Sequence, residues 1–208
     1  MAYKTILFDV DNTLIDSATI AATVFHEVAA NYGLAVPAKT IRGLVGIPTE
    51  KIIQQLKLTH ATEINRDFTS EIGTHKDELR LFDGIHETWD KLLAIGLQIG
   101  VVTSRTTAEV KSDLGNFPEI TNLPIIVTAD KTTEHKPSGA PLEYAIQQYN
   151  LIKAETMYVG DTIYDLQSAL NAGIDFASAT WGALASTDFS KATYQPEEPT
   201  DLLKIVKI

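Results

Sequence analysis

From Leu81 onward, short apolar runs alternate with segments whose apolar residues have helical spacing. The runs predict buried strands at 97–103, 124–128, 156–159 and 174–178, and the segments between them predict helices at 85–95, 107–114, 141–149 and 163–172. Lys4–Val10 predicts one further strand, and the tail predicts a last short strand and a helix. Such alternation is typical of parallel strands joined by right-handed helical crossovers.

The segment from Ser17 to Arg80 has a different character, because nothing in it alternates like a strand. Helices are predicted at 17–32, 38–44, after Thr49 and at 62–80, with a break at 46–48. Asp16 or Ser17 can cap the first helix and Gly33 can end it. The first two strands should be neighbours, yet 94 residues separate Asp9 from Thr103, which is too long for one crossover.

We therefore predict an α/β protein with a Rossmann-like parallel sheet core and an inserted all-α cap domain. The core would comprise residues 1–16 and 81–208, and the cap residues 17–80. The alternative is that these helices pack on one flank of the sheet. Both Trp89 and Trp181 are expected in the core.

Polar residues follow the first four predicted strands. The groups are Asp9 and Asp11; Thr103, Ser104 and Arg105; Lys131, His135 and Lys136; and Asp161 and Asp165. In an open parallel sheet, ligands bind outside the carboxyl ends of the strands, so these groups should converge along one edge. This convergence is stronger evidence for a site than any single motif.

The acidic residues indicate a cation. Two carboxylates as close as those of Asp9 and Asp11 repel one another, and Mg²⁺ prefers oxygen ligands. Carboxylates around magnesium that face a lysine and a hydroxyl form a pocket for a phosphoryl group. A carboxylate that does not bind the metal can attack phosphorus and give an aspartyl-phosphate.

The ordered motifs "FDVDNTL", "VVTSR", "HKPSG" and "VGDTIYD" resemble the haloacid dehalogenase-like hydrolase superfamily. More closely, the chain resembles its phosphoglycolate phosphatase-like branch, in which a small helical cap is inserted after the first strand. The resemblance implies that Asp9 is the nucleophile and a magnesium ligand. It implies that Asp11 protonates the leaving oxygen and then activates water, while its main-chain carbonyl binds magnesium. Thr103 would hold the transferring phosphoryl group, and Lys136 would stabilise its charge.

The same resemblance assigns Asp161 to magnesium, Asp165 to support of the metal site and Thr13 to buttressing of the first loop. The sequence departs from the usual pattern in three places. Asn12 replaces a common glycine, Gly139 stands where proline is frequent, and Ser104-Arg105 replaces a common Asn-Lys pair. The last change leaves open whether Thr103 or Ser104 faces the phosphate, and it makes Arg105 a candidate anion contact.

The composition of the chain excludes several classes of function. The net charge of -10 and the pI of about 4.9 argue against a nucleic-acid or anionic-membrane surface. The lack of cysteine excludes disulfides, thiolate catalysis and zinc-thiolate sites. No run reaches the ~20 apolar residues of a membrane span, and the N-terminal apolar run is too short for a signal peptide, so a cytoplasmic location is expected. The five histidines show no metal spacing.

The leading hypothesis is a magnesium-dependent phosphatase, acting as a monomer or homodimer on a small phosphorylated metabolite. Candidate substrates are phosphoglycolate-like compounds, sugar phosphates, nucleotides and pyrophosphate. The alternatives are a phosphosugar mutase of the same superfamily and a non-enzymatic phospho-ligand-binding or receiver-like module. Lys136 is favoured over Lys131 as the catalytic lysine because Pro137 follows it.

Overall fold

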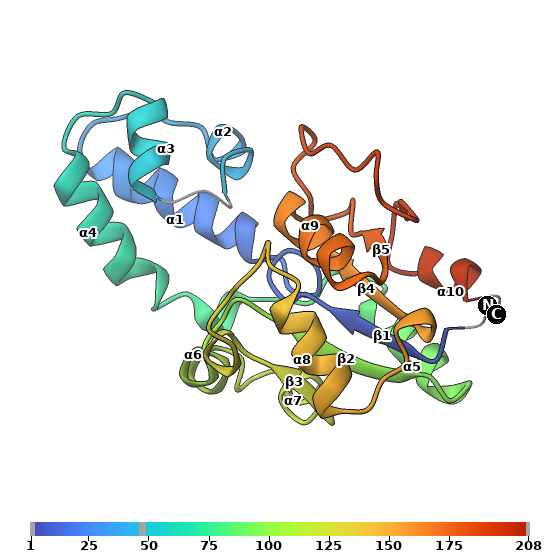
Figure 1. Cartoon of the computed structure of the whole chain (residues 1–208). Coiled ribbons are helices and arrows are strands. Elements are labelled where there is room, and N and C mark those ends of the chain that lie inside the picture. The colour runs from blue at the N-terminus through green and yellow to red at the C-terminus, as the bar shows by residue number, and fades with distance from the viewer. Residues whose placement is uncertain (1–2, 46–48, 207–208) are drawn as a thin grey trace. The chain divides into compact units, whose positions relative to one another are not determined.

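The computed structural model describes residues 3–45 and 49–206 (Figure 1). Its contacts divide the chain into two compact units. One unit combines Met1–Ile15 with Leu81–Ile208, and the other is Asp16–Arg80. Each unit is described separately below.

The larger unit is built on a parallel sheet of five strands in the order β3-β2-β1-β4-β5. The strands are β1 (Thr5–Phe8), β2 (Gln98–Val102), β3 (Ile125–Val127), β4 (Thr156–Gly160) and β5 (Asp175–Ser178). The central strand β1 pairs with β2 on one side and with β4 on the other, so that Phe8 lies opposite both Val101 and Val159. The predicted fold class, including the pairing of the first two strands, is confirmed.

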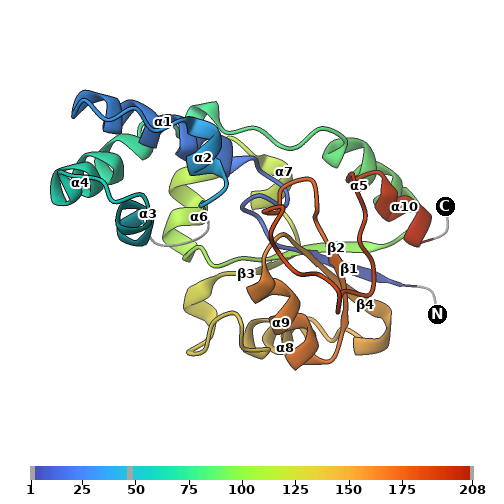
Figure 2. The same cartoon turned by 90° about the horizontal axis from the view of Figure 1, so that it is seen from above.

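Helices cover both faces of this sheet. Figure 2 shows α8 (Ala140–Gln148) and α9 (Ile163–Ala172) on one face, with α5 (Ile85–Ala94) and α10 (Asp201–Ile205) on the other. The link from β2 to β3 contains α6 (Thr107–Asp113) and α7 (Pro118–Thr121), and short 3-10 turns are formed by Ala129–Lys131 and Lys153–Glu155. The core beneath α8 and α9 includes Leu7, Val102, Leu142, Tyr158 and Phe176.

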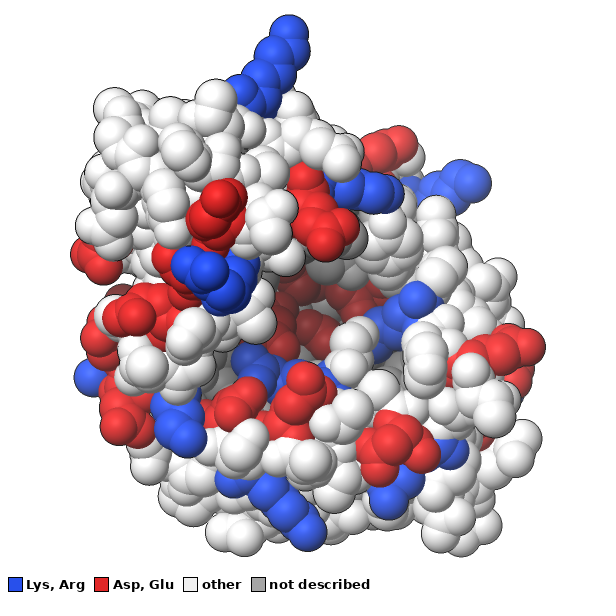
Figure 3. Space-filling view, turned by 90° about the vertical axis from the view of Figure 1, so that its left-hand side faces the viewer, with Lys and Arg blue, Asp and Glu red and all other residues white. Residues whose placement is uncertain are grey.

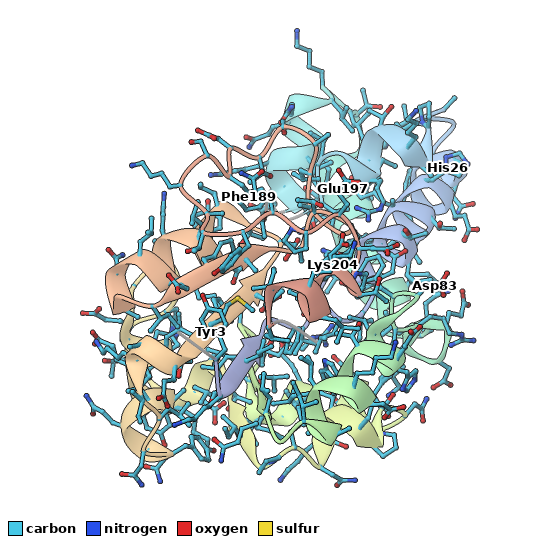
Figure 4. The ribbon with its side chains drawn as sticks, turned by 90° about the vertical axis from the view of Figure 1, so that its right-hand side faces the viewer. Tyr3, His26, Asp83, Phe189, Glu197 and Lys204 are labelled. Carbon is cyan, nitrogen blue, oxygen red and sulfur yellow. The ribbon has the colours of Figure 1, made fainter. Side chains whose placement is uncertain are left out.

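At the amino ends of the strands, remote from the motifs, a side-chain hydrogen bond links β1 and β5. Tyr3 lies at the start of β1 in Figure 4, and its hydroxyl donates to Asp175 Oδ2 at 2.5 Å at the start of β5. In this unit one helix was missed and one prediction was wrong. Helix α7 was not expected, and the expected strand in the tail is only an isolated bridge between Ala177 and Tyr194. The tail runs through prolines, which do not donate to a strand ladder.

The smaller unit contains α1 (Ser17–Asn31), α2 (Ala38–Arg42), α3 (Thr49–Gln55), α4 (Ala61–Ile72) and a 3-10 turn at Lys76–Glu78. Its core includes Phe25, Val28, Ile41, Ile53 and Ile64. Asp16 caps α1 by accepting a hydrogen bond from Thr19 N at 3.2 Å, and Gly33 follows the helix with a φ of 75°.

Two predictions in this unit need comment. The helix expected over 62–80 was wrong beyond Ile72, because Gly73 follows α4 and the Thr74 hydroxyl donates to the Glu71 carbonyl at 2.8 Å. The expected break at 46–48 lies outside the described residues. His26 lies on α1 (Figure 4), and its Nδ1 is 2.6 Å from the Val36 carbonyl oxygen. This contact with the main chain gives His26 a structural role within the unit.

Within residues 3–45 and 49–206, no helix combines the length and hydrophobicity that crossing a membrane requires. On the face seen in Figure 3, acidic and basic side chains are interspersed among uncharged ones. That distribution does not resemble the continuous basic surface of a nucleic-acid-binding protein.

Candidate active site

The motif residues lie at the carboxyl ends of the three central strands. Asp9 follows β1, and its main-chain N–H donates to the Val159 carbonyl at 2.8 Å. Thr103 follows β2 in the same way, with its N–H donating to the Val127 carbonyl at 2.9 Å. Asp161 directly follows β4. Because all the strands are parallel, their carboxyl ends gather these side chains on one edge of the sheet.

Three buried carboxylates form the centre of this edge. Asp9, Asp161 and Asp165 each present an oxygen within 4.8 Å of the others. Lys136 adds the balancing cation: its Nζ lies 2.6 Å from Asp9 Oδ1 and 2.8 Å from Asp165 Oδ1. The side chain of Lys136 is only 7% exposed, so these ion pairs are shielded from solvent. The sequence placed all four residues near one another, and the structure brings them together.

One ammonium does not compensate three buried carboxylates. Burial, with the neighbouring carboxylates, raises the pKa of Asp9 to about 7 although Lys136 opposes the shift. Burial likewise raises the pKa of Asp161 to about 8, with Asp9 and Asp165 adding to the effect. Burial alone would lower the pKa of Lys136, but Asp165 and Asp9 outweigh it and raise that pKa. The cluster of three carboxylates and Lys136 therefore favours the binding of a further positive charge.

The oxygens of Asp165 are engaged by protein donors. Oδ1 accepts from the Tyr158 hydroxyl at 2.9 Å in addition to its ion pair with Lys136. Oδ2 accepts from the main-chain N–H of Thr162 at 3.1 Å and from the Thr162 hydroxyl, which completes the capping box of α9. These bonds fix Asp165 as a group that orients its neighbours. A side chain at Gly160 would collide with it, because a Cβ there would lie 2.6 Å from Asp165 Cβ.

The remaining carboxylates suit a divalent metal. Asp9 and Asp161 offer hard oxygen ligands in a buried setting, where their repulsion favours a bound cation over two free charges. The hydrogen bond from Lys136 Nζ goes to Oδ1 of Asp9, so Oδ2 of Asp9 is a candidate ligand for a metal. The donor set therefore fits the hard cations and offers none of the soft ligands that select thiophilic metals.

The loop after Asp9 is a tight turn. Leu14 N and Ile15 N both donate to the Val10 carbonyl, at 2.9 and 3.0 Å. Asn12 adopts a φ of 56°, in the left-handed region that asparagine tolerates better than most residues. Thr13 is fully buried, and its hydroxyl donates to Asp161 Oδ1 at 3.4 Å, which links this turn to the carboxylate after β4.

A second segment holds this turn from outside. The indole N–H of Trp181 donates to the Thr13 carbonyl at 2.9 Å, across 168 positions of sequence. Gly182 packs so closely on the turn that a Cβ there would lie 1.6 Å from the Asn12 carbonyl oxygen. The expectation that Trp181 belongs to the core was wrong, because it is partly exposed and supports the turn. Trp89 is buried against Phe8, as expected, with ring centroids 5.6 Å apart.

The loop after β2 carries Thr103, Ser104 and Arg105. Thr103 is buried and Ser104 is exposed. The Thr103 Oγ1 atom accepts from Arg105 N at 3.1 Å. The Arg105 guanidinium contacts carboxylates: Nε and Nη2 donate to the two oxygens of Asp11, each at 2.8 Å, and Nη1 donates to Asp113 Oδ2 at 2.9 Å. The sequence did not indicate this pairing.

A cavity of about 270 Å³ opens beside this loop. Its lining comprises Thr103, Ser104, Ala129, His135, Lys136 and Pro141. His135 shows no metal-binding spacing, but it belongs to the polar group that was expected after the third strand, and it lines this cavity beside Lys136. Lys131 lines a different cavity with residues of α6 and β3. Lys136 is therefore the lysine that contacts Asp9.

Comparisons with known proteins agree with this arrangement. A family model described as haloacid dehalogenase-like hydrolase matches residues 6–179. A protein from Oceanobacillus iheyensis named pyrophosphatase PpaX is 27% identical over 214 residues, covering 99% of this chain and 98% of its own length.

Solved structures of similar proteins share this fold. A Lactobacillus plantarum protein, provisionally named a phosphoglycolate phosphatase, is 27% identical with a TM-score of 0.79 and covers 99% of this chain and 100% of its own. A Thermotoga maritima protein, provisionally named a beta-phosphoglucomutase, shares the fold with a TM-score of 0.77 at 18% identity, covering 98% of each chain.

Proposed function

Because the chain belongs to the haloacid dehalogenase-like hydrolase family, we propose that it is a magnesium-dependent phosphatase of a small phosphorylated metabolite. The observation that carries this proposal is the buried group of Asp9, Asp161 and Asp165 around Lys136. Pyrophosphate and phosphoglycolate enter the list of candidate substrates through the names of similar proteins.

In the proposed reaction, a carboxylate oxygen of Asp9 attacks phosphorus and the bond from phosphorus to the leaving oxygen breaks. The product is an aspartyl-phosphate. Asp11 protonates a leaving oxygen that needs a proton, then takes a proton from the water that attacks the aspartyl-phosphate. This second attack releases inorganic phosphate and restores Asp9.

The other residues hold the phosphoryl group. Lys136 contacts Asp9 and lines the cavity beside Thr103, so a buried cation and a hydroxyl would be available to the phosphoryl oxygens. Asp9, Asp161 and the main-chain carbonyl of Asp11 would hold Mg²⁺, with Asp165 and Thr13 orienting them. When bound, Mg²⁺ supplies positive charge to the phosphate oxygens.

We further propose that residues 17–80 act as a cap. This unit has its own apolar core of helices, so it can move as a body. A cap that closes over a phosphatase site excludes bulk water and selects the leaving group. Substrate preference would then depend on residues of both units.

The test is release of inorganic phosphate from phosphoglycolate, sugar phosphates, nucleotides, pyrophosphate and an aryl phosphate, with Mg²⁺ and with EDTA. We expect release that requires Mg²⁺, and Asp9→Asn should abolish it while the circular dichroism spectrum stays unchanged. Asp83→Asn is the matched control, since Asp83 is exposed and remote in sequence from every motif. A near-normal rate in Asp9→Asn would overturn the mechanism.

A further inference from the structure

Arg105 binds the carboxylate that the proposed mechanism places at the leaving group. Both oxygens of Asp11 accept from its guanidinium at 2.8 Å, through Nε and Nη2. This bidentate geometry is the one by which arginine also binds phosphate. The third nitrogen, Nη1, bonds to Asp113 at 2.9 Å, so the guanidinium stands between two carboxylates.

The main chain fixes where this cation lies. Arg105 follows Thr103 by two residues, and its N–H donates to Thr103 Oγ1 at 3.1 Å. Thr103 and Ser104 line the same cavity as Lys136, so Arg105 extends directly from the loop that is proposed to hold the phosphoryl group. Its side chain then reaches Asp11, which lies 94 positions away in sequence. Because the proposed mechanism has Asp11 protonate the leaving oxygen, a guanidinium bound to Asp11 would lie beside the leaving group.

We propose that Arg105 selects phosphoanhydrides, such as inorganic pyrophosphate, over phosphate esters of alcohols by binding the departing phosphate. This inference rests on the proposed phosphatase function. In the reaction, an Asp9 oxygen bonds to phosphorus, the bridging P–O bond breaks, and its electron pair leaves on the bridging oxygen as inorganic phosphate. Phosphate is a stable anion near neutral pH, so its departure needs a cation and no added proton.

An alcohol leaving group has different needs. Its alkoxide requires a proton as the P–O bond breaks. The alkoxide also carries no phosphate oxygens that the guanidinium fork could bind. Arg105 thus favours a leaving group that is itself a phosphate.

The carboxylates on the Arg105 guanidinium are accessible enough for a phosphate to replace them. The Asp11 and Asp113 side chains are 36% and 34% exposed, so an incoming phosphate can replace either on the guanidinium. Arg105 itself is 19% exposed, which keeps its charge partly shielded from solvent. A purely structural tie between the β2 loop and α6 would be expected to affect all substrates alike.

The experiment compares kcat/KM for pyrophosphate and for a primary alkyl phosphate in wild type, Arg105→Gln and Arg105→Lys, with Mg²⁺ present. We expect Arg105→Gln to lower the pyrophosphate value about 100-fold, the scale for loss of one donor that binds a developing anion. The alkyl phosphate value should stay within about threefold of wild type, because its leaving group offers the guanidinium no phosphate oxygens. Arg105→Lys should lose less on pyrophosphate, since lysine keeps the charge without the planar fork.

Inhibition by imidodiphosphate supplies a readout that does not depend on turnover, and Arg105→Gln should weaken it while inhibition by orthophosphate changes less. Arg66→Gln is the control, because Arg66 is an exposed arginine of the smaller unit. An equal fall for both substrates, or no change for either, would overturn the role of Arg105 and leave the phosphatase proposal standing. A wild-type protein that releases phosphate from neither substrate would refute both.

Discussion

Replacing Lys136 by methionine tests the electrostatics of the proposed site. Methionine has similar length and fills the same space, but it leaves Asp9 and Asp165 without the ammonium that now lies 2.6 and 2.8 Å from them. All three side chains are less than one tenth exposed, so water cannot replace the lost partner without local opening. We expect a large loss of stability in metal-free protein together with loss of turnover.

The size of the loss follows from these distances. At an effective dielectric constant of about 20, each ion pair at such a separation contributes about 6 kcal/mol of attraction. The desolvation of the ammonium offsets several kcal/mol of that sum, and removal of one partner from a buried pair costs about 3–5 kcal/mol in practice. For a chain of this length, 1 kcal/mol shifts the melting temperature by about 2–4 °C, so a fall of about 6–20 °C is expected.

The loss should also depend on pH. Without Lys136, Asp9 and Asp161 can relieve their repulsion by binding protons, which is easier at low pH. The fall in melting temperature should therefore be smaller at pH 5.5 than at pH 8, and saturating Mg²⁺ should recover part of it. The assay is scanning calorimetry in EDTA and in Mg²⁺ at both pH values.

Lys204→Met is the matched control, because Lys204 pairs with Asp201 at an exposed position and should leave the melting temperature near that of wild type. A fall of under about 2 °C in Lys136→Met, or an equal fall at both pH values, would refute this account of the buried charges.

Two further predictions concern the carboxylates and the turn that follows Asp9. The folded-state pKa values of Asp9 and Asp161, about 7 and about 8, lie above the ordinary value of 3.8, so their protonation stabilises the metal-free fold at low pH. The melting temperature in EDTA should carry a contribution that falls as pH rises from about 4 to about 8. The gain on adding Mg²⁺ should grow over the same range, and a gain that shrinks would contradict it. Trp181→Phe should cost about 1 kcal/mol by removing the indole hydrogen bond to Thr13, and should lower kcat more than it changes KM. An unchanged kcat would show that Trp181 does not position the turn.

Much of the fold was predictable because its signals are local. A strand buried on both faces of a parallel sheet reads as a short apolar run, and the first polar residue after the run marks its carboxyl end. Asp9, Thr103 and Asp161 each occupy such a position, and strand order then brings them to one edge. Helix ends were harder to predict. The pattern over 62–80 continued past Gly73, where side-chain bonds to the main chain ended α4.

The contacts that were missed are those that no local pattern encodes. Trp181 reaches the turn after Asp9 from a loop that follows β5, and sequence spacing does not show which way an indole points. The pairing of Arg105 with Asp11 depends on side-chain conformations at two strand ends. The residue types were visible in the sequence, and Arg105 was named as an anion contact, but the structure was needed to show that its partner is Asp11.

Charge connects the two clusters at this edge. Asp9, Asp161 and Asp165 with Lys136 carry two excess negative charges when all are ionised, and Asp11 and Asp113 with Arg105 carry one more. A phosphorylated substrate is itself an anion, so neither cluster alone would attract it. The first cluster is buried and needs a small cation of high charge, whereas the second is partly exposed and can exchange a carboxylate for a phosphate. Under the proposed mechanism, binding of a divalent cation at Asp9 and Asp161 would make this end of the sheet receptive to phosphate, and Arg105 would then favour a leaving group that is itself anionic.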